Sequence, residues 1–394
     1  MGGSRACKHM LDVWLDFDPA GFVATGLDVD DDLAYLCARA LERRGDLRLV
    51  GVSVVAGNAA LRDTVADAEL LLRHAGDDAP IVAGASWDDM RVAWPSMRRL
   101  HALRGDVAGS AGAAARAMRR AVRAAEPRTV TILALGPLTN VAALLALDPS
   151  VARRLRRVVA MGGALDGGPL DLNWMSDRAA ARALLAAGVP TTVVPLDACA
   201  QAAFAAADVA AVAACPGAAA RALAPKMRLQ AYAMPLLVNG RLARRFPDTA
   251  HAALLDGAAA FVPWDVVALF AATDPASYFD EWREVALAAP PCDGGEPCDG
   301  TVSALVAARP VANVTAWLEG DDARAFGVGS GLALAPTRLR AGAVVASMRA
   351  LLCEVPAAGP VPRVLPGAAP HAAAAVAAAV AAPLLLRRWW RCHS

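Results

Sequence analysis

Seven aspartates crowd the stretch from residue 11 to residue 36, which reads LDVWLDFDPAGFVATGLDVDDDLAYL. Asp16 and Asp18 close an apolar run, and residues 30–32 are three consecutive aspartates. Carboxylates held this close repel one another, so either a cation neutralises them or some take up a proton with a raised pKa. Carboxylate oxygens, main-chain carbonyls and water suit a hard cation such as Ca²⁺ or Mg²⁺. The stretch therefore predicts a metal or catalytic site.

Part of this charge has an ordinary structural explanation. Asp28 can cap the helix expected to start near Asp30, and acidic residues in a first turn interact favourably with the helix dipole. Asp12 is expected at the surface. Capping does not explain Asp16 and Asp18, which end a strand, so the metal or catalytic interpretation is preferred for the set.

Val- and Ile-rich apolar runs alternate with helical stretches along the chain. The expected strands span residues 11–17, 47–57, 128–135, 156–163 and 190–197. The expected helices span residues 31–45, 60–76, 136–147 and 176–188. This alternation predicts an α/β fold with a mostly parallel central sheet and helices on both faces.

Polar or flexible residues recur directly after the expected strands. They include Asp18, Asn58, Gly136, Gly163 and Asp197. In open parallel sheets, ligands bind beyond the carboxyl ends of the strands. We therefore expect these positions to converge on one crevice.

The aspartate stretch resembles a known family signature. LDFDP followed by GLDVDDDLA resembles the N-terminal aspartate motif of the nucleoside hydrolases, the inosine–uridine-type N-ribohydrolases. Further segments resemble the family's later motifs, in the same order: SVVAGN, ILALGPLTNVAALL, VVAMGGAL, DLNWMSDRAAARALLAAGVPTTVVPLD and DGAAAFVPWDVVALFAATDP. The resemblance covers roughly residues 11–350. It implies a Rossmann-like nucleoside hydrolase domain over residues 1–355, and an Ala-rich tail over residues 356–394 that is disordered or helical.

The resemblance also implies an activity, hydrolysis of the N-glycosidic bond of purine ribonucleosides to free base and ribose. Asp18, Asp31, Asp265 and the main-chain carbonyl of Leu135 would bind Ca²⁺, and Asp18 would take the proton from the attacking water. Asp16 matches the leading aspartate of the motif and is expected to support this group. The remaining aspartates Asp12, Asp28 and Asp32 are expected to be structural or solvent-facing.

Substrate contacts follow from the same resemblance. The ribose hydroxyls would be held by Asp30, Asn58, Asp171 and Asn173. Trp264 stands directly before Asp265, where many relatives have His, and this matches the purine-preferring branch. A stacked indole can sandwich a purine and favour its protonated form. Its partner would be Trp94 or Trp87, and His251 would be a pocket acid.

The chain departs from the family pattern in several places. Residues 19–27 lengthen the connection between Asp18 and Asp30, Asp32 replaces a small apolar residue, and Asp171 replaces a Glu. The alternative function is therefore a catalytically weak or inactive nucleoside- or ribose-binding protein on the same fold. A third interpretation takes LDFDP as a phosphatase motif of the haloacid dehalogenase type. That chemistry needs a downstream Lys, and Lys226 does not follow an expected strand.

Composition limits the partners. The formal net charge is +1, from 39 basic and 38 acidic residues, which gives no field to attract nucleic acid. No secretory signal is recognised at the N-terminus, so a cytoplasmic location is expected. A membrane role is not favoured, although the tail leaves a C-terminal anchor open. The family implies a homodimer or homotetramer.

The eight cysteines include no CxxC pair, so a zinc site is not expected. Cys292 and Cys298 could form a disulfide, but two free thiols are preferred because the chain lacks the cysteine density of a small secreted domain.

Overall fold

A ten-stranded sheet runs through the computed structural model. The structure describes residues 10–22, 28–90, 109–165, 171–237, 261–287, 304–311 and 332–355. The strand order is β3-β2-β1-β4-β5-β7-β10-β8-β9-β6. The strands are β1 (Leu11–Phe17), β2 (Leu47–Val54), β3 (Ile81–Ala83), β4 (Val130–Ala134), β5 (Arg157–Met161), β6 (Ala164–Leu165), β7 (Thr191–Val194), β8 (Phe279–Leu287), β9 (Ala304–Pro310) and β10 (Leu332–Leu339).

Only β8 runs antiparallel to its neighbours, β10 and β9, and the other pairs are parallel. The predicted α/β fold with a mostly parallel central sheet is therefore confirmed. The strands that the sequence analysis did not predict are the short β3 and β6 and the C-terminal strands β8, β9 and β10.

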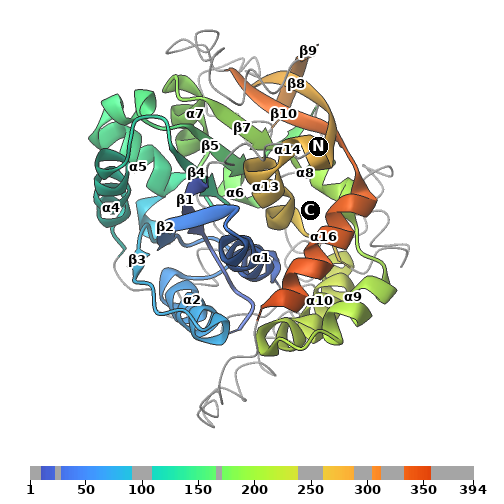
Figure 1. Ribbon diagram of the computed structural model, residues 1–394. Coiled ribbons are helices and arrows are strands. Elements are labelled where there is room, and N and C mark those ends of the chain that lie inside the picture. Colours follow the sequence, from blue (N-terminus) through green and yellow to red (C-terminus); the bar gives the residue numbers. More distant parts are fainter. Residues whose placement is uncertain are drawn as a thin grey trace, which may run out of the picture.

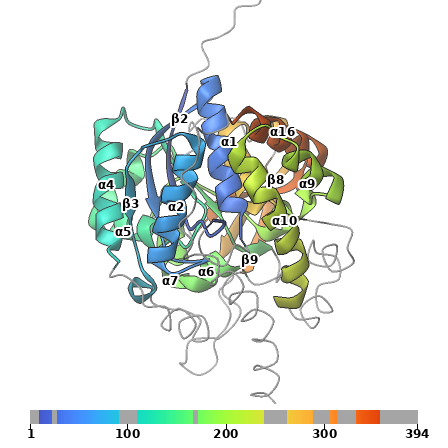
Figure 2. The same ribbon diagram turned by 90° about the horizontal axis from the view of Figure 1, so that it is seen from below.

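Helices cover both faces of the sheet (Figures 1 and 2). In the first half of the chain these are α1 (Asp30–Arg44), α2 (Leu61–Ala75), α4 (Ala111–Ala124), α5 (Thr139–Leu147), α6 (Leu172–Ser176) and α7 (Arg178–Ala186). In the second half they are α8 (Leu196–Cys199), α9 (Ala206–Ala213), α10 (Ala218–Leu237), α13 (Trp264–Thr273), α14 (Pro275–Tyr278) and α16 (Ala341–Glu354). Three short 3₁₀ helices are η1 (Trp87–Asp89), η2 (Pro149–Arg153) and η3 (Ala200–Ala202).

The two faces of the sheet bury separate apolar cores. Along β1, Val13, Leu15 and Phe17 point into a core shared with α1, α2, α10, α13 and α16, whereas Trp14 points into a core shared with α4, α5 and α7. This alternation follows from the two-residue period of a strand. Burial on both faces explains why the parallel strands are so uniformly apolar.

The strand ends on the carboxyl side lie level with one another. Phe17 pairs with Val54, and Met161 pairs with Val194. The first residues after β1, β2, β4, β5 and β7 therefore emerge at one edge, as the sequence analysis expected.

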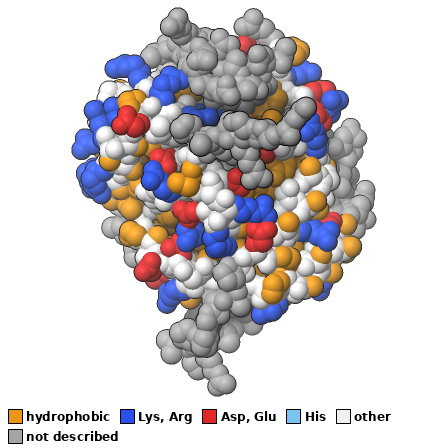
Figure 3. Space-filling model, viewed as in Figure 1, with side chains coloured by type: hydrophobic (Ala, Val, Ile, Leu, Met, Phe, Trp, Pro, Cys, Tyr) orange, Lys and Arg blue, Asp and Glu red, His pale blue; other side chains and the backbone are white. Residues whose placement is uncertain are grey.

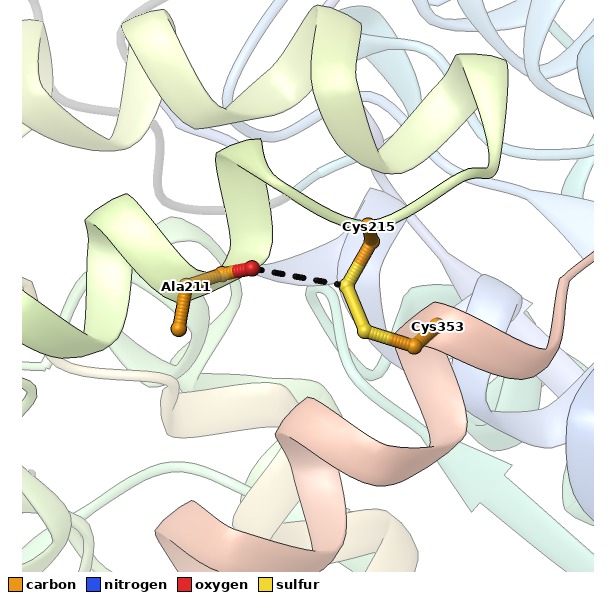
Figure 4. Close-up of a disulfide and its surroundings, with 3 residues drawn as sticks. All are labelled: Ala211, Cys215 and Cys353. Carbon is orange, nitrogen blue, oxygen red and sulfur yellow. Dashed lines mark hydrogen bonds between the residues drawn. A yellow bond between two sulfur atoms is a disulfide. The ribbon is translucent and has the colours of Figure 1, made fainter.

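A disulfide joins Cys215, shortly after α9, to Cys353 in the last turn of α16 (Figure 4). The two cysteines are 138 positions apart. The Sγ of Cys215 also lies 3.6 Å from the carbonyl oxygen of Ala211. This bond was not predicted from the sequence, and the pair considered there, Cys292 and Cys298, lies outside the described residues.

Charge is distributed unevenly between surface and interior. Lys and Arg side chains gather at the left edge in Figure 3, where α4 lies in Figure 1.

Six of the seven N-terminal aspartates are buried, and Asp28 is half-buried. Asp12 was expected at the surface, but it is 9% exposed. It accepts two hydrogen bonds from Arg48, each 2.8 Å long, and this ion pair compensates its burial.

The C-terminal segment 356–394 lies outside the described residues, so its predicted character stays a prediction. In the part of the chain that is described, no helix is both long enough and apolar enough to cross a membrane.

Candidate active site

Asp18 lies at the end of β1, between two glycines that follow β2 and β4. A Cβ on Gly136 would fall 2.5 Å from Asp18 Oδ1, and a Cβ on Gly57 would overlap Asp18 Oδ2. Both neighbours must therefore lack side chains for the Asp18 carboxylate to fit. Oδ2 accepts the Asn58 N–H at 2.7 Å, whereas Oδ1 is buried without a hydrogen-bond partner among the described residues.

The first turn of α1 brings two further carboxylates to this point. Asp31 Oδ1 accepts the main-chain N–H of Asp18 at 3.1 Å, and its Oδ2 accepts the side-chain amide of Asn58 at 3.1 Å. Asp30 Oδ2 accepts the main-chain N–H of Asp265 at 3.3 Å. These bonds join β1, the loop after β2, α1 and the start of α13.

Among the described residues, Asp30, Asp31 and Asp265 form a group of carboxylates that could hold a metal ion. Each offers an oxygen within 4.8 Å of the other two. Asp18 is not one of these three, and it reaches the group through its main-chain bond to Asp31. Asp30 was expected to hold ribose and Asp18 to bind the metal, and the structure brings Asp30 into the same carboxylate group as Asp31 and Asp265.

Burial raises the pKa of every carboxyl in this group. The pKa of Asp31 is raised to about 8, mainly by burial and also by the neighbouring charge of Asp28, while hydrogen bonds from Asp18 and Asp265 act in the opposite direction. The pKa values of Asp18, Asp30 and Asp265 are also well above their usual range, first through burial and then through neighbouring aspartates. Ionised carboxylates can coexist here only with a compensating positive charge.

The donor set fits a hard divalent cation. All four side chains offer carboxylate oxygens, and the buried Oδ1 atoms of Asp18 and Asp30 have no hydrogen-bond partner among the described residues. Oxygen donors without sulfur or imidazole suit Ca²⁺ or Mg²⁺ rather than zinc. The residues present can therefore hold the predicted kind of metal.

A second group of predicted residues lies at the ends of β4 and β5. The side-chain amide of Asn173 donates to the Leu135 carbonyl and, at 3.4 Å, to the Met161 carbonyl. Asp171 is the N-cap of α6 and accepts the Trp174 N–H at 2.8 Å. Burial raises the pKa of Asp171 to about 6, although main-chain hydrogen bonds lower it. The structure thus brings Leu135 and Asn173 into direct contact.

The predicted aromatic residues are only partly described. Trp264 is the first residue of α13, directly beside Asp265, and is 7% exposed. Its ring meets Phe261 edge-on, with centroids 6.5 Å apart. Trp87 lies in η1 after β3 and is 5% exposed. Trp94 and His251 lie outside the described residues.

Asp16, expected to support the site, lies in a polar network whose other members were not predicted. Asp16 Oδ1 accepts Ser53 Oγ at 2.6 Å and the Asn140 side-chain amide at 2.8 Å. Trp14 Nε1 donates to Ser53 Oγ, and Asn140 Oδ1 accepts the Ala85 N–H, both at 2.8 Å. Asn140 closes the GPLTN motif and lies in the first turn of α5, so its place in that motif was the available signal. The network connects the ends of β1 and β2 with the segment after β3 and with α5.

The chain is similar to a family of nucleoside hydrolases and to several individual proteins. Residues 13–326 match the family described as inosine-uridine preferring nucleoside hydrolase. The non-specific ribonucleoside hydrolase RihC of Escherichia fergusonii is 31% identical over an alignment of 204 residues that covers 48% of this chain and 62% of that protein. Uridine nucleosidase 1 of Arabidopsis thaliana is 30% identical over 190 residues, 44% of this chain and 55% of that protein.

The chain thus covers less than two thirds of either curated relative. A solved structure of the purine-preferring ribonucleoside hydrolase from Gardnerella vaginalis has the same fold, with a TM-score of 0.60 at 18% identity. That match covers 87% of this chain and 98% of the other. Because the family match spans most of the chain, this protein belongs to the inosine-uridine preferring nucleoside hydrolase family.

Proposed function

We propose that this chain hydrolyses the N-glycosidic bond of ribonucleosides, releasing the free base and ribose. The observation that carries the proposal is the meeting of Asp18, Asp31 and Asp265 at one buried point. The family signature needs these carboxylates together, and residues 19–27 do not separate them. The longer connection after Asp18 is thus compatible with a site in which the three carboxylates still meet.

The proposed metal is Ca²⁺, with Asp18, Asp31, Asp265 and the Leu135 carbonyl as the residues that would hold it. Its chemical contribution is a positive charge that makes an adjacent water easier to deprotonate. The described carboxylates also need such a charge to be ionised together. The negative charge of these carboxylates would therefore favour metal binding, and the bound metal would in turn activate the water.

In the proposed reaction the water oxygen bonds to C1′ of the ribose as the bond from C1′ to the base nitrogen breaks. The electron pair of that bond leaves with the base, which takes up a proton as it departs, and Asp18 takes the proton from the water. Its Oδ1 has no hydrogen-bond partner among the described residues and is therefore available as an acceptor. The ribosyl group becomes oxocarbenium-like, and the surrounding carboxylates stabilise its positive charge.

Ribose is proposed to be held by Asp30, Asn58, Asp171 and Asn173. Acceptors and amides at fixed positions select a sugar by its hydroxyl pattern, since each unmatched buried group is costly. Asn58 is already oriented by its contacts with Asp18 and Asp31. Asn58 therefore belongs to the proposed sugar site and also contacts the proposed metal ligands.

A preference for purine bases is the finer proposal. Its support is Trp264, beside Asp265, with Trp94 or Trp87 as a stacking partner and His251 as a pocket acid. Two relatives are named as non-specific and uridine-cleaving enzymes, and a structural neighbour as purine-preferring. Base preference therefore has to be measured on this chain.

Ribose release is the direct test. Purified protein is incubated with inosine, adenosine, guanosine or uridine, with Ca²⁺ or with a chelator. We expect ribose from the purine nucleosides, loss of activity with the chelator and recovery with added Ca²⁺. A folded protein that releases no ribose from any of the four is not a nucleoside hydrolase of this kind.

The second candidate is a nucleoside- or ribose-binding protein with weak turnover or none. It is favoured by one observation, namely that the side-chain nitrogen of Asn173 and one carboxylate oxygen of Asp171 already bond to main-chain groups of the protein. Calorimetry with inosine and with ribose separates the two candidates. Saturable binding without ribose release supports the binding protein.

A homodimer or homotetramer is proposed from the family resemblance. Size-exclusion chromatography with light scattering gives the mass directly, and a monomer at micromolar concentration contradicts it.

A cytoplasmic location is also proposed. Disulfides are typical of oxidising compartments, so in the cytoplasm we expect Cys215 and Cys353 to be reduced. Alkylation of thiols at the moment of lysis, followed by mass spectrometry, reports their state, and an oxidised pair in cells contradicts this location.

A further inference from the structure

Two carboxylates on different helices accept main-chain hydrogen bonds from the residues that follow Asp18. Asp32, on the first turn of α1, accepts the Gly21 N–H at 3.1 Å through Oδ2. Asp67, on α2, accepts the Phe22 N–H through Oδ1 at 2.5 Å. Both aspartates are fully buried. The described start of the 19–27 insertion is therefore fixed to the protein through its main chain.

The side chain of Phe22 adds a second attachment. Its ring stacks on His74 of α2, with centroids 4.7 Å apart and an interplanar angle of 17°. The ammonium of Lys226, on α10, lies 5.1 Å from the centre of the same ring. A cation over an aromatic face is attracted by the ring. Three helices, α1, α2 and α10, thus converge on residues 21 and 22.

The carboxylate of Asp32 packs so closely against Gly21 that the loop has no room for a side chain there. A Cβ on Gly21 would lie 2.6 Å from Asp32 Oδ2, so a larger residue would push the carboxylate away. Asp32 is in hydrogen-bond contact with Asp67, and the positive charge of Lys226 acts on both. The family pattern has a small apolar residue at position 32, which could not accept the Gly21 N–H.

We propose that Asp32 is a positioning residue for the cation site, and this inference rests on the metal-dependent function proposed above. Asp31 holds the Asp18 N–H, and the next residue, Asp32, holds the Gly21 N–H three positions further along. Two consecutive carboxylates on one helical turn therefore hold the main chain by hydrogen bonds on both sides of residues 19 and 20. A longer connection has more conformations to lose, so an extra anchor keeps Asp18 against α1.

The test measures Ca²⁺ affinity by calorimetry and kcat and KM for inosine in three variants. Asp32→Ala removes the acceptor, and we expect Ca²⁺ to bind about 10–100-fold more weakly, as for other residues that orient metal ligands. Asp32→Asn keeps an oxygen for Gly21 and an amide for Asp67, and we expect affinity within about threefold of wild type. Lys226→Met removes the charge but keeps both main-chain hydrogen bonds, and no loss of Ca²⁺ affinity is expected.

Asp208→Ala is the matched control, because Asp208 accepts the Ala205 N–H at 2.9 Å on the remote helix α9. Its Ca²⁺ affinity should equal that of wild type even where its melting temperature falls. Folded Asp32→Ala protein with wild-type Ca²⁺ affinity overturns the inference. So does a Lys226→Met loss as large as that of Asp32→Ala, because charge rather than the hydrogen bond would then be responsible.

The calcium titration also separates this inference from the proposed activity. Wild-type protein that binds Ca²⁺ but releases no ribose contradicts the activity, and the Asp32 variants still report on positioning. Wild-type protein that binds no Ca²⁺ overturns the inference itself, since there is then no site to position.

Discussion

The main-chain N–H of Asp18 donates to a carboxylate oxygen of Asp31 over 3.1 Å, although the residues are 13 positions apart. The other oxygen of Asp31 accepts the side-chain amide of Asn58, and the Asn58 main chain donates to the carboxylate of Asp18. This closed set of bonds orients both carboxylates with one asparagine. It leaves Asp18 Oδ1 as the oxygen available for chemistry.

Replacing Asp18 with Asn tests its role as the base. The amide keeps the shape of the carboxylate and can still accept the Asn58 N–H, but it cannot take a proton from water. We expect kcat for inosine to fall by about 10²–10⁴-fold with a small change in KM. Initial rates of ribose release measure this, with Asp78→Asn at an exposed site as the control. A variant that keeps most of its turnover would place the base at another residue.

The raised carboxyl pKa values predict how stability depends on pH in the absence of metal. Folded-state pKa values of about 8 for Asp31 and about 7 for Asp16 exceed the ordinary aspartate value of 3.8. The folded chain therefore holds protons that the unfolded chain releases above pH 4. These groups make their full contribution to the free energy of unfolding below about pH 4, and this contribution is lost as the pH rises towards 8. Melting temperature in chelator should fall over this range.

Added Ca²⁺ should reverse this loss, because a cation stabilises the ionised carboxylates and binds only the folded chain. The increase in melting temperature on adding Ca²⁺ should be larger at pH 8 than at pH 5. The same increase at both pH values, or none, would mean that these carboxyls are not the binding groups.

Much of the fold could be predicted because the parallel strands and their helices carry strong local patterns. β1 alternates between two cores, and α1 ends at Gly45 as its sequence indicates. The residues expected at strand ends do emerge at one edge. The C-terminal strands β8, β9 and β10 were not predicted, because β8 carries four charged residues while β9 and β10 are rich in Ala and contain Pro, and these residue types are depleted in strands.

The site was harder to predict where it depends on long-range contacts. Asp32 and Asp67 are 35 positions apart, and nothing local indicates that they would grip adjacent residues of one loop. Asn140 reaches Asp16 from 124 positions away. Motif resemblance supplied the metal and ribose roles, but not the residues that hold those groups in place.

Trp264 can be tested for its part in base preference. Trp264→Phe keeps an apolar ring at a 7% exposed position while weakening stacking on a purine. We expect kcat/KM for inosine to fall about tenfold, with a smaller fall for uridine, so that the purine preference narrows. Trp282→Phe is the control, because Trp282 is similarly buried, 5% exposed, on the distant strand β8. An equal fall for both nucleosides would indicate loss of packing rather than of base recognition.

The disulfide between Cys215 and Cys353 should stabilise the fold more than the chemistry. It closes a loop of 138 positions and fixes the end of α16, where Glu354 also pairs with Arg44 of α1. Replacing both cysteines with Ser should lower the free energy of unfolding by about 2–4 kcal/mol, because the unfolded chain gains freedom. Denaturant titration with and without reductant measures this. Reductant should destabilise wild type and leave the double variant unchanged, whereas an unresponsive wild type would mean that the two thiols are not bonded.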